Sequence, residues 1–476
     1  MSHLTCGIDI GSTNVKVVLA HGDGRAVHTA AVPTPRVSDG IGPTTDAAAL
    51  VALLESMIIA GWREVGRGVP LLAIAAAGVG EDGLGIDADL RPTGLSLPWF
   101  DGRAAAEAEE LRGAGAATPR TGIAVGPDRT AAKWLWLRRH RPEELRAARQ
   151  WIALTDYPAA WWSGTPFMSG TLAPRTACYD VYDRRWIDGL LDAAGAPPIP
   201  ALHRAGHPVC GMRPGPLTQS GAASAATLLV AGGHDHPVAA AAIRRIAPMA
   251  RVDSMGTANL VYGEASGPAA PTLDPFMALS VPPSDAPGLA CLGVMELSAA
   301  LADVRGDGVD LRGLLDGARL PGEPMTVADG VGHDRKTAIR LALERATLHT
   351  RRMLAAMDAA GAPAGPLYAT GGWSRSHAFL ELRASVFGQP VHVIDEPELT
   401  AIGAAFLACE AARGVAPRLD AIRSVRTVDP VDAWVPAYDA VYPAASALLE
   451  AKSKRRDHRS EPMSTGAQGR TTHGLY

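Results

Sequence analysis

Two turns in this sequence combine residue types that bind phosphate. The first lies in CGIDIGSTNVKVVLA, residues 6–20, where a polar turn separates two short apolar strands. A tight turn with glycine can direct backbone N–H groups at one anion, short hydroxyl and amide side chains add donors, and a lysine adds positive charge. These features make a candidate phosphate cradle of Gly11, Ser12, Thr13, Asn14 and Lys16.

Asp9 ends the strand that leads into this turn, where a carboxylate is placed to hold a magnesium ion or its waters. A polar hairpin turn that binds nothing is the alternative. Two scarce residue types favour the cradle. The chain has only two asparagines, Asn14 and Asn259, and only three lysines before residue 451, of which Lys16 is one.

The second turn follows about half a chain later, in RVDSMGTANLVYGEA at residues 251–265. Apolar strands again flank small and hydroxyl residues, and Asp253 followed by MGTAN matches Asp9 followed by GSTN with one extra residue. This weak repeat predicts two related halves.

A third candidate for chemistry is Asp235, in TLLVAGGHDHPVAAAAI at residues 227–243. The pattern predicts a buried strand, a Gly-Gly turn and the start of an alanine-rich helix, for which Asp235 would be a good N-cap. His234 and His236 flank it, but no distant cluster of ligands completes a zinc site.

The remaining pattern predicts an α/β protein. Three apolar strands precede a helix at 45–65 and a strand at 70–80, and a long amphipathic helix at 335–360 precedes another strand. Further helices are expected at 104–111, 130–149, 187–194 and 399–412. The G-x-G-x-x-G at 78–83 precedes a strand rather than a helix, which argues against dinucleotide binding.

Length and composition narrow the class of protein. A chain of 476 residues predicts about two domains, here 1–243 and 244–450, followed by a disordered polar tail at 451–476. With 47% hydrophobic residues, 20% charged residues and a net charge of -4, we expect an ordinary soluble protein without nucleic acid as a partner. The sequence shows no leader and no membrane span, which predicts a cytoplasmic protein.

Four segments in order resemble the FGGY carbohydrate kinases of the actin-like ATPase superfamily. DIGSTNVK looks like the first phosphate motif of that family, AGGHDHPVAAAA the segment with the catalytic aspartate, and MGTAN the second phosphate motif. TGGWSRS followed by LTAIGAAFLA looks like the adenosine-binding segment. The resemblance implies two actin-like, ribonuclease H-like α/β domains with a catalytic cleft between them.

The same resemblance assigns roles to residues. Asp235 would be the general base and, with Asp9, would hold Mg²⁺, while ATP would meet both turns and the adenosine segment. For Trp373, core packing is as good a reading as nucleotide contact. Beyond the first turn, the ATP contacts implied are Gly256, Thr257, Gly371, Gly372, Trp373 and Ser376.

The sugar side departs from better-known relatives. Xylulose kinases carry a Gln-Met-His-like segment where this chain has Gly80, Glu81 and Asp82, and a carboxylate here resembles the acidic contact of glycerol kinases. Glu81 or Asp82 would bind hydroxyls of the acceptor, or form an ordinary turn. The remaining substrate contacts implied are Trp99, Asp101, Arg103, His234, Asp235 and His236, with a structural ion pair as the alternative for Asp101 and Arg103.

The expected function is ATP-dependent phosphorylation of a ketose, polyol or sugar acid, with a homodimer as a possible assembly. The alternatives are a catalytically silent sugar-binding regulator, which would be expected to lose Asp235, and another actin-like ATPase or N-acetylhexosamine kinase.

Overall fold

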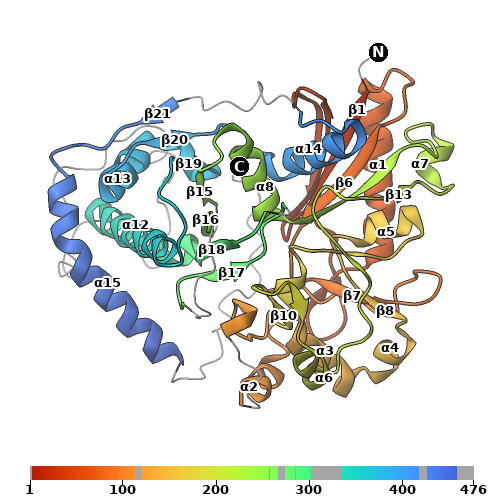
Figure 1. The fold of residues 1–476 in the computed structure, drawn as a ribbon, viewed down its shortest axis with the longest axis horizontal. Coiled ribbons are helices and arrows are strands. Elements are labelled where there is room, and N and C mark those ends of the chain that lie inside the picture. Colours follow the sequence, from red (N-terminus) through yellow and green to blue (C-terminus); the bar gives the residue numbers. More distant parts are fainter. Residues whose placement is uncertain are drawn as a thin grey trace.

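The protein folds around two β-sheets that lie side by side (Figure 1). In the computed structural model, the structure describes residues 3–113, 119–256, 258–265, 274–284, 286–301, 335–417 and 426–457. One sheet has six strands, the other seven, and small two-stranded ribbons complete the strands of these residues.

The first sheet grows outward from a hairpin. Its strand order is β13-β14-β6-β1-β2-β3, with β1 antiparallel to β2 and parallel to β6, which is parallel to β14. The strands β1 and β2 are apolar and largely buried because helices cover the sheet. Their bounds are β1 Leu4–Ile10, β2 Asn14–His21, β3 Ala26–Pro33, β6 Ala73–Gly78, β13 Pro208–Gly211 and β14 Leu228–His234.

The second sheet repeats this plan. Its order is β17-β18-β16-β15-β19-β20-β21. In each sheet, strands joined in antiparallel pairs lie on one side of the first strand, and two parallel strands and an antiparallel edge strand lie on the other. The repeat predicted from the two turns is therefore a repeat of topology. The bounds are β15 Arg251–Met255, β16 Asn259–Ala265, β17 Ala278–Ser280, β18 Leu289–Met295, β19 Leu367–Thr370, β20 Val391–Val393 and β21 Arg426–Val428.

Two helices lie between the sheets. Helix α8 (Asp235–Ile246) leads from the first sheet to the second, and α14 (Leu399–Arg413) packs against α8, β1 and β6, although it comes late in the chain. Figure 1 shows α14 beside β1. Both helices bury alanines on these contacts, which permits close approach. The C-terminal half therefore contributes a layer to the N-terminal sheet.

The other helices cover the outer faces. Helix α1 packs on β3 and β2, and α12 contacts β16, β18, α13 and α15. Helices α2, α3, α4 and α6 build an added layer beside the first sheet, whereas α5 packs on β6, β13 and β14 (Figure 1). Their bounds are α1 Ala47–Val65, α2 Ala105–Gly113, α3 Thr130–His140, α4 Pro142–Ala147, α5 Tyr157–Ser163, α6 Asp188–Ala194, α7 Pro216–Gln219, α9 Leu297–Ala300, α12 Arg335–Ala359, α13 His377–Phe387 and α15 Val435–Asp457.

Three expected boundaries are wrong. The helix expected at 130–149 is two helices, because Pro142 cannot continue α3 and instead starts α4. The Gly-Gly pair is not a turn but part of β14, where Gly232 passes too close to Ala76 of β6 for any side chain. Residues 451–457 extend α15 rather than starting a disordered tail, since Ala, Lys and Arg favour helix. Residues 458–476 lie outside the described residues.

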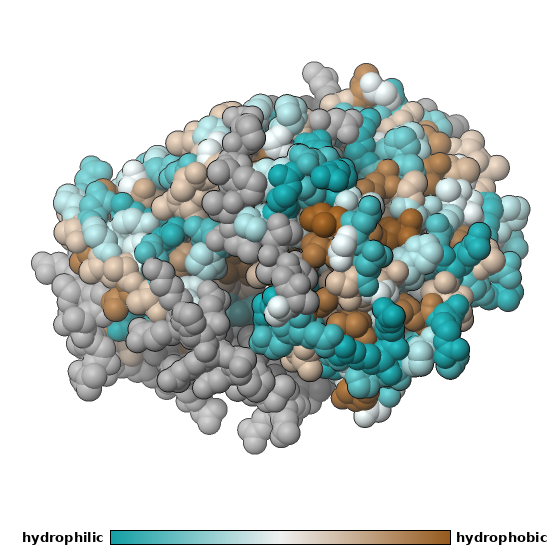
Figure 2. Space-filling model, turned by 60° about the horizontal axis from the view of Figure 1, so that its bottom comes forward, coloured by the Kyte–Doolittle hydropathy of each residue, from teal (hydrophilic) through white to brown (hydrophobic). Residues whose placement is uncertain are grey.

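Polar and apolar residues alternate over the face shown in Figure 2. The exposed large apolar side chains of the described residues are Val37, Ile41, Phe100, Met249, Val294, Val415 and Leu448. Among the described helices, none is both long and apolar enough to cross a bilayer.

A buried ion pair anchors the second sheet. The guanidinium of Arg383 on α13 donates to Asp253 on β15 through Nε at 2.7 Å and Nη2 at 2.9 Å, and both side chains are fully buried. Asn259 donates to the same carboxylate at 2.6 Å and accepts from Arg383 and Thr350. Asp253, the counterpart of Asp9, is therefore part of the core.

We predict that Arg383→Met destabilises the protein by about 3–5 kcal/mol, because it leaves a buried carboxylate without its cation. Urea unfolding followed by circular dichroism measures this loss. The double variant Asp253→Asn with Arg383→Met should recover part of it, since no charge is then left unpaired. A loss below about 1 kcal/mol in the single variant would contradict this assignment.

A second buried carboxylate, Asp156, precedes α5. It accepts from the backbone N and the Oγ of Ser169, each at 2.6 Å, and burial raises its pKa from 3.8 to about 7 against the effect of these bonds. Between these values the unfolded chain releases a proton that the folded protein keeps. Asp156 therefore favours the folded state most at acid pH, and this contribution declines as the pH rises towards 7.

Asp156→Asn should remove this dependence while it keeps partners for Ser169. We expect the stability of the wild type relative to the variant to fall by about 1.4 kcal/mol per unit between roughly pH 5 and 7. Melting temperatures of both proteins across this range provide the measurement. Parallel curves would show that Asp156 is ionised in the folded protein throughout.

Candidate active site

Most of the predicted site residues lie at strand ends on one edge of each sheet. The parallel strands β14, β6 and β1 are neighbours, and their carboxyl ends carry Asp235, Glu81 and Asp9 in that order. In the second sheet, Gly256 directly follows β15 and Gly371 directly follows β19. Ligands of open α/β sheets bind outside such carboxyl ends.

The backbone carbonyls of the first turn accept hydrogen bonds from the segment that follows β3. Thr34 donates to the oxygen of Gly11 at 2.7 Å and to that of Thr13 at 2.9 Å, and Arg36 donates to that of Ser12 at 3.0 Å. Within the described residues, the N–H groups of Ser12 and Thr13 have no hydrogen-bond acceptor. The turn thus presents donors without competing acceptors, which suits an anion.

Lys16 brings three acidic residues into one electrostatic group. Its Nζ lies 2.9 Å from Glu398 and 3.9 Å from Asp9, which stands directly opposite on β1. Burial raises the pKa of Asp9 to about 7; Lys16 opposes the rise, while Asp235 and Glu398 add to it. Asp9 and Asp235 therefore lie close enough to repel each other, and a cation between them would relieve this repulsion.

Asp235 is the first residue of α8, and His234 occupies the N-cap position. Its Oδ1 accepts from the backbone N of His236 at 2.7 Å and lies 3.3 Å from Nε2 of His234. Burial lowers the pKa of His234 to about 4, so this imidazole is neutral near pH 7. Asp235 keeps 21% of its side chain exposed, which leaves it open to an acceptor.

Glu81 is held by two arginines. Arg175 donates to its Oε1 through Nε at 2.8 Å and through Nη2, and Arg129 donates through Nη1. Burial opposes ionisation, yet Arg175 and Arg129 keep the pKa of Glu81 well below its usual range. Glu81 is therefore an ionised carboxylate in a nearly dry position.

Asp82 and Trp99 are joined by a hydrogen bond. The carboxylate of Asp82 accepts from the backbone N of Trp99 at 2.7 Å, and burial raises its pKa to about 6. The fully buried Lys133 donates at 3.0 Å to the carbonyls of both Glu81 and Leu97. Lys133 thus fixes the distance between the two segments expected to contact the acceptor.

Asp101 and Arg103 form an ion pair with each other. The Nε of Arg103 donates to Asp101 at 2.8 Å, and Arg103 and Arg141 both pair with Asp39. The guanidinium of Arg103 is nearly buried against the ring of Trp136. These contacts favour the structural reading of the pair.

The second turn meets the adenosine segment. Gly371 has φ +92°, and a Cβ there would lie 2.5 Å from the carbonyl oxygen of Met255, so only glycine fits. Gly371 and Gly372 are exposed, whereas Trp373 packs edge-on against Phe379. Ser376 is buried and caps α13 by accepting from the N of Phe379. Thr257 lies outside the described residues.

The carboxylates suit magnesium better than a metal held by protein alone. Within the described residues, no three His, Cys, Asp or Glu side chains converge tightly enough to hold a metal. Mg²⁺ is commonly bound through one or two carboxylates together with substrate phosphates and waters. Asp9 and Asp235 beside the open amides of the first turn fit that pattern.

Sequence reasoning missed several contributors. Arg36 joins the first turn to the ring of Phe100, whose centroid lies 5.2 Å from its guanidinium carbon, and Glu398 reaches Lys16 from the start of α14. Arg129 and Arg175 also went unnoticed. No local motif marks these residues, since their partners are 24 or more positions away in the chain.

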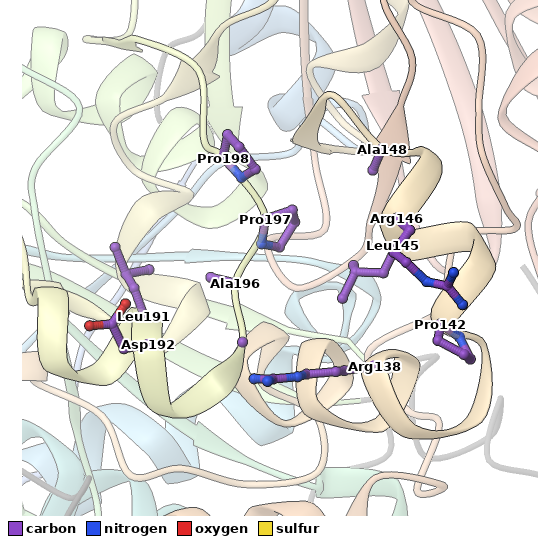
Figure 3. Close-up of a pocket in the computed structure, with 11 residues that line it drawn as sticks. Arg138, Pro142, Leu145, Arg146, Ala148, Leu191, Asp192, Ala196, Pro197 and Pro198 are labelled. Carbon is purple, nitrogen blue, oxygen red and sulfur yellow. The ribbon is translucent and has the colours of Figure 1, made fainter.

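A separate hollow of about 600 Å³ lies among α3, α4 and α6 (Figure 3). Arg138, Leu145 and Leu191 line it from these three helices. None of the predicted site residues lines it.

We predict that Gly371→Ala lowers the melting temperature of the free protein by several degrees, because the new methyl group meets the backbone of the second turn. Gly372→Ala is the matched control, since a Cβ there meets nothing within 4 Å. Calorimetry with ATP then separates an effect on nucleotide binding from an effect on stability. If the nucleotide lies against this segment, Gly372→Ala weakens ATP binding without lowering stability; unchanged binding would contradict that contact.

Comparison with known proteins finds similar chains over most of this sequence. A xylulose kinase of Streptomyces coelicolor is 28% identical over 436 residues, 84% of this chain and 86% of the relative. Another from Streptomyces rubiginosus is 28% identical over 455 residues, 90% of this chain and 92% of the relative.

A crystal structure of xylulose kinase from Rhodospirillum rubrum matches with a TM-score of 0.84 at 22% identity, covering 96% of this chain and 100% of that chain. The expected two-domain actin-like fold is confirmed. Residues 4–242 match the N-terminal domain of the FGGY family of carbohydrate kinases, and residues 323–412 match its C-terminal domain. The chain belongs to the FGGY family of carbohydrate kinases.

Proposed function

We propose that this ATP-dependent carbohydrate kinase phosphorylates a hydroxyl of a neutral ketose or polyol, with Asp235 as general base. The observation that carries the choice of acceptor is the ionised Glu81 at the carboxyl edge of β6, one strand away from Asp235. An ionised carboxylate accepts hydrogen bonds from hydroxyl groups, whereas it has no proton to donate to the carboxylate of a sugar acid. The named relatives, which are xylulose kinases, act on a neutral ketose of this kind.

Asp235 would take the proton of the attacking hydroxyl as the γ-phosphoryl group moves to that oxygen. The open amides of Ser12 and Thr13, with Lys16, would bind the phosphates of ATP. Asp9 and Asp235 would hold Mg²⁺, which supplies charge neutralisation at the phosphates. The adenosine would lie against Gly371 and Gly372.

The other proposed site residues shape the two phosphate turns or border the acceptor. Gly11 and Asn14 shape the first phosphate turn and Gly256 the second, while Asp82, Trp99 and His236 would border the acceptor. Homodimer formation and a cytoplasmic location stay predictions from the sequence.

We predict that Asp235→Asn lowers kcat by about 10²–10⁴-fold, because the amide cannot take the proton of the attacking hydroxyl. ADP release from Mg-ATP, measured across ketopentoses, ketohexoses, polyols and sugar acids, provides the assay. Asp188→Asn is the matched control, because Asp188 also begins a helix but is exposed and is not one of the proposed site residues.

A kcat for Asp235→Asn within threefold of wild type, with lowered stability, would show that Asp235 serves α8 and not catalysis. A wild-type preference for a sugar acid would contradict the proposed acceptor class while leaving the kinase reaction intact.

A further inference from the structure

The carboxylate of Glu81 is paired with two arginines, and His234 lies near enough to influence its ionisation. Arg129 precedes α3, Arg175 belongs to the short 3₁₀ helix Ala173–Thr176, and His234 ends β14. The side chains of Glu81 and Arg175 are 8% and 10% exposed, so the pair lies almost out of solvent. Ionic hydrogen bonds in such a place are strong, and the charges depend on one another to stay ionised.

The hydrogen bonds of Glu81 are unevenly shared between its two oxygens. Both arginines donate to Oε1, and among the described residues no donor reaches Oε2. The two guanidiniums therefore hold the carboxylate in place through Oε1, while Oε2 remains able to accept hydrogen bonds. An arrangement that served stability alone would gain from satisfying both oxygens.

Arg175 also fills the space that Gly80 leaves. A Cβ at Gly80 would lie 2.5 Å from Cγ of Arg175 and 3.1 Å from Cδ2 of His234. The stem of Arg175 therefore lies against the loop after β6, which also approaches the end of β14, whose next residue is Asp235. Its position links the acceptor loop to the proposed base.

Other charges near Glu81 cannot replace Arg175. Lys133 donates to two backbone carbonyls, and Arg129 also contacts Asp128 at 3.1 Å. His234 is neutral near pH 7, and Asp82 adds a nearby acid. Arg175 is the largest of the influences that favour ionised Glu81.

We propose that Arg175 is a specificity-determining residue that, with Arg129, holds Glu81 so that Oε2 accepts hydroxyls of a neutral acceptor. Arg175 is a positioning residue in this role, since it acts through Glu81. Because its guanidinium is engaged by Glu81, a carboxylate of a sugar acid would meet Oε2 rather than a free cation. This inference rests on the proposed neutral acceptor.

The test compares Arg175→Met, Arg175→Lys and Gly80→Ala with wild type on its best acceptor. We expect Arg175→Met to raise the KM for the acceptor about tenfold or more, with the KM for ATP within about twofold. An acid limb should appear in its kcat/KM for the acceptor between about pH 5 and 7, because burial then raises the pKa of Glu81. Arg175→Lys keeps the positive charge but loses the planar pair of guanidinium donors. The acid limb should therefore be weaker than in Arg175→Met, while the KM for the acceptor stays raised.

Gly80→Ala keeps every charge and moves Arg175, so it should raise the KM for the acceptor without an equal loss in kcat. Arg251→Met is the control for loss of a buried, paired arginine, since Arg251 pairs with Asp358 at the far end of β15 from the second turn. It should lower stability only.

Folded variants of Arg175 with unchanged acceptor KM and an unchanged pH profile would overturn the proposal, as would equal changes in the KM for ATP. The activity of the wild type across the panel of acceptors distinguishes a failure of this proposal from a failure of the proposed function. A wild type that prefers a sugar acid refutes the neutral acceptor and, with it, the specificity role of Arg175. A neutral preference that is unaffected in the variants refutes the role of Arg175 alone.

Discussion

The chemistry proposed for this chain depends on three parallel strands that end at one edge of the first sheet. Strands β14, β6 and β1 run parallel and side by side, so residues far apart in sequence reach the same edge. Asp9 and Asp235 are separated by more than 200 positions, yet the charge of Asp235 adds to the rise in the pKa of Asp9. The second sheet repeats the plan with β15 and β19.

The two halves use matching aspartates differently. Asp253 is neutralised by Arg383 in the core, whereas Asp9 faces Lys16 and other acids with a pKa raised by burial to about 7. A buried carboxylate that keeps its cation stabilises a fold, while one that lacks full compensation is prepared to receive a cation. Asp253 therefore supports the fold, whereas Asp9 is the candidate metal ligand.

The sequence predicted the elements with local signals. The strand-turn-strand patterns, the helix before β6 and the long helix α12 followed from apolar spacing and glycine placement, and the repeat of the two turns anticipated two similar sheets. Long-range contacts were not predictable in this way. The packing of α14 on β1, the contact of Glu398 with Lys16 and the arginines on Glu81 depend on tertiary structure. The Gly-Gly pair misled because close approach of strands and a turn both call for glycine.

The most direct test is a crystal structure with a neutral ketose acceptor and a non-hydrolysable ATP analogue. The account predicts that one acceptor hydroxyl lies within hydrogen-bond distance of Asp235 and faces the γ-phosphate, and that other hydroxyls contact Oε2 of Glu81. The phosphates should lie over the amides of Ser12 and Thr13. An acceptor bound away from Asp235, with Glu81 still closed off by protein, would contradict the account.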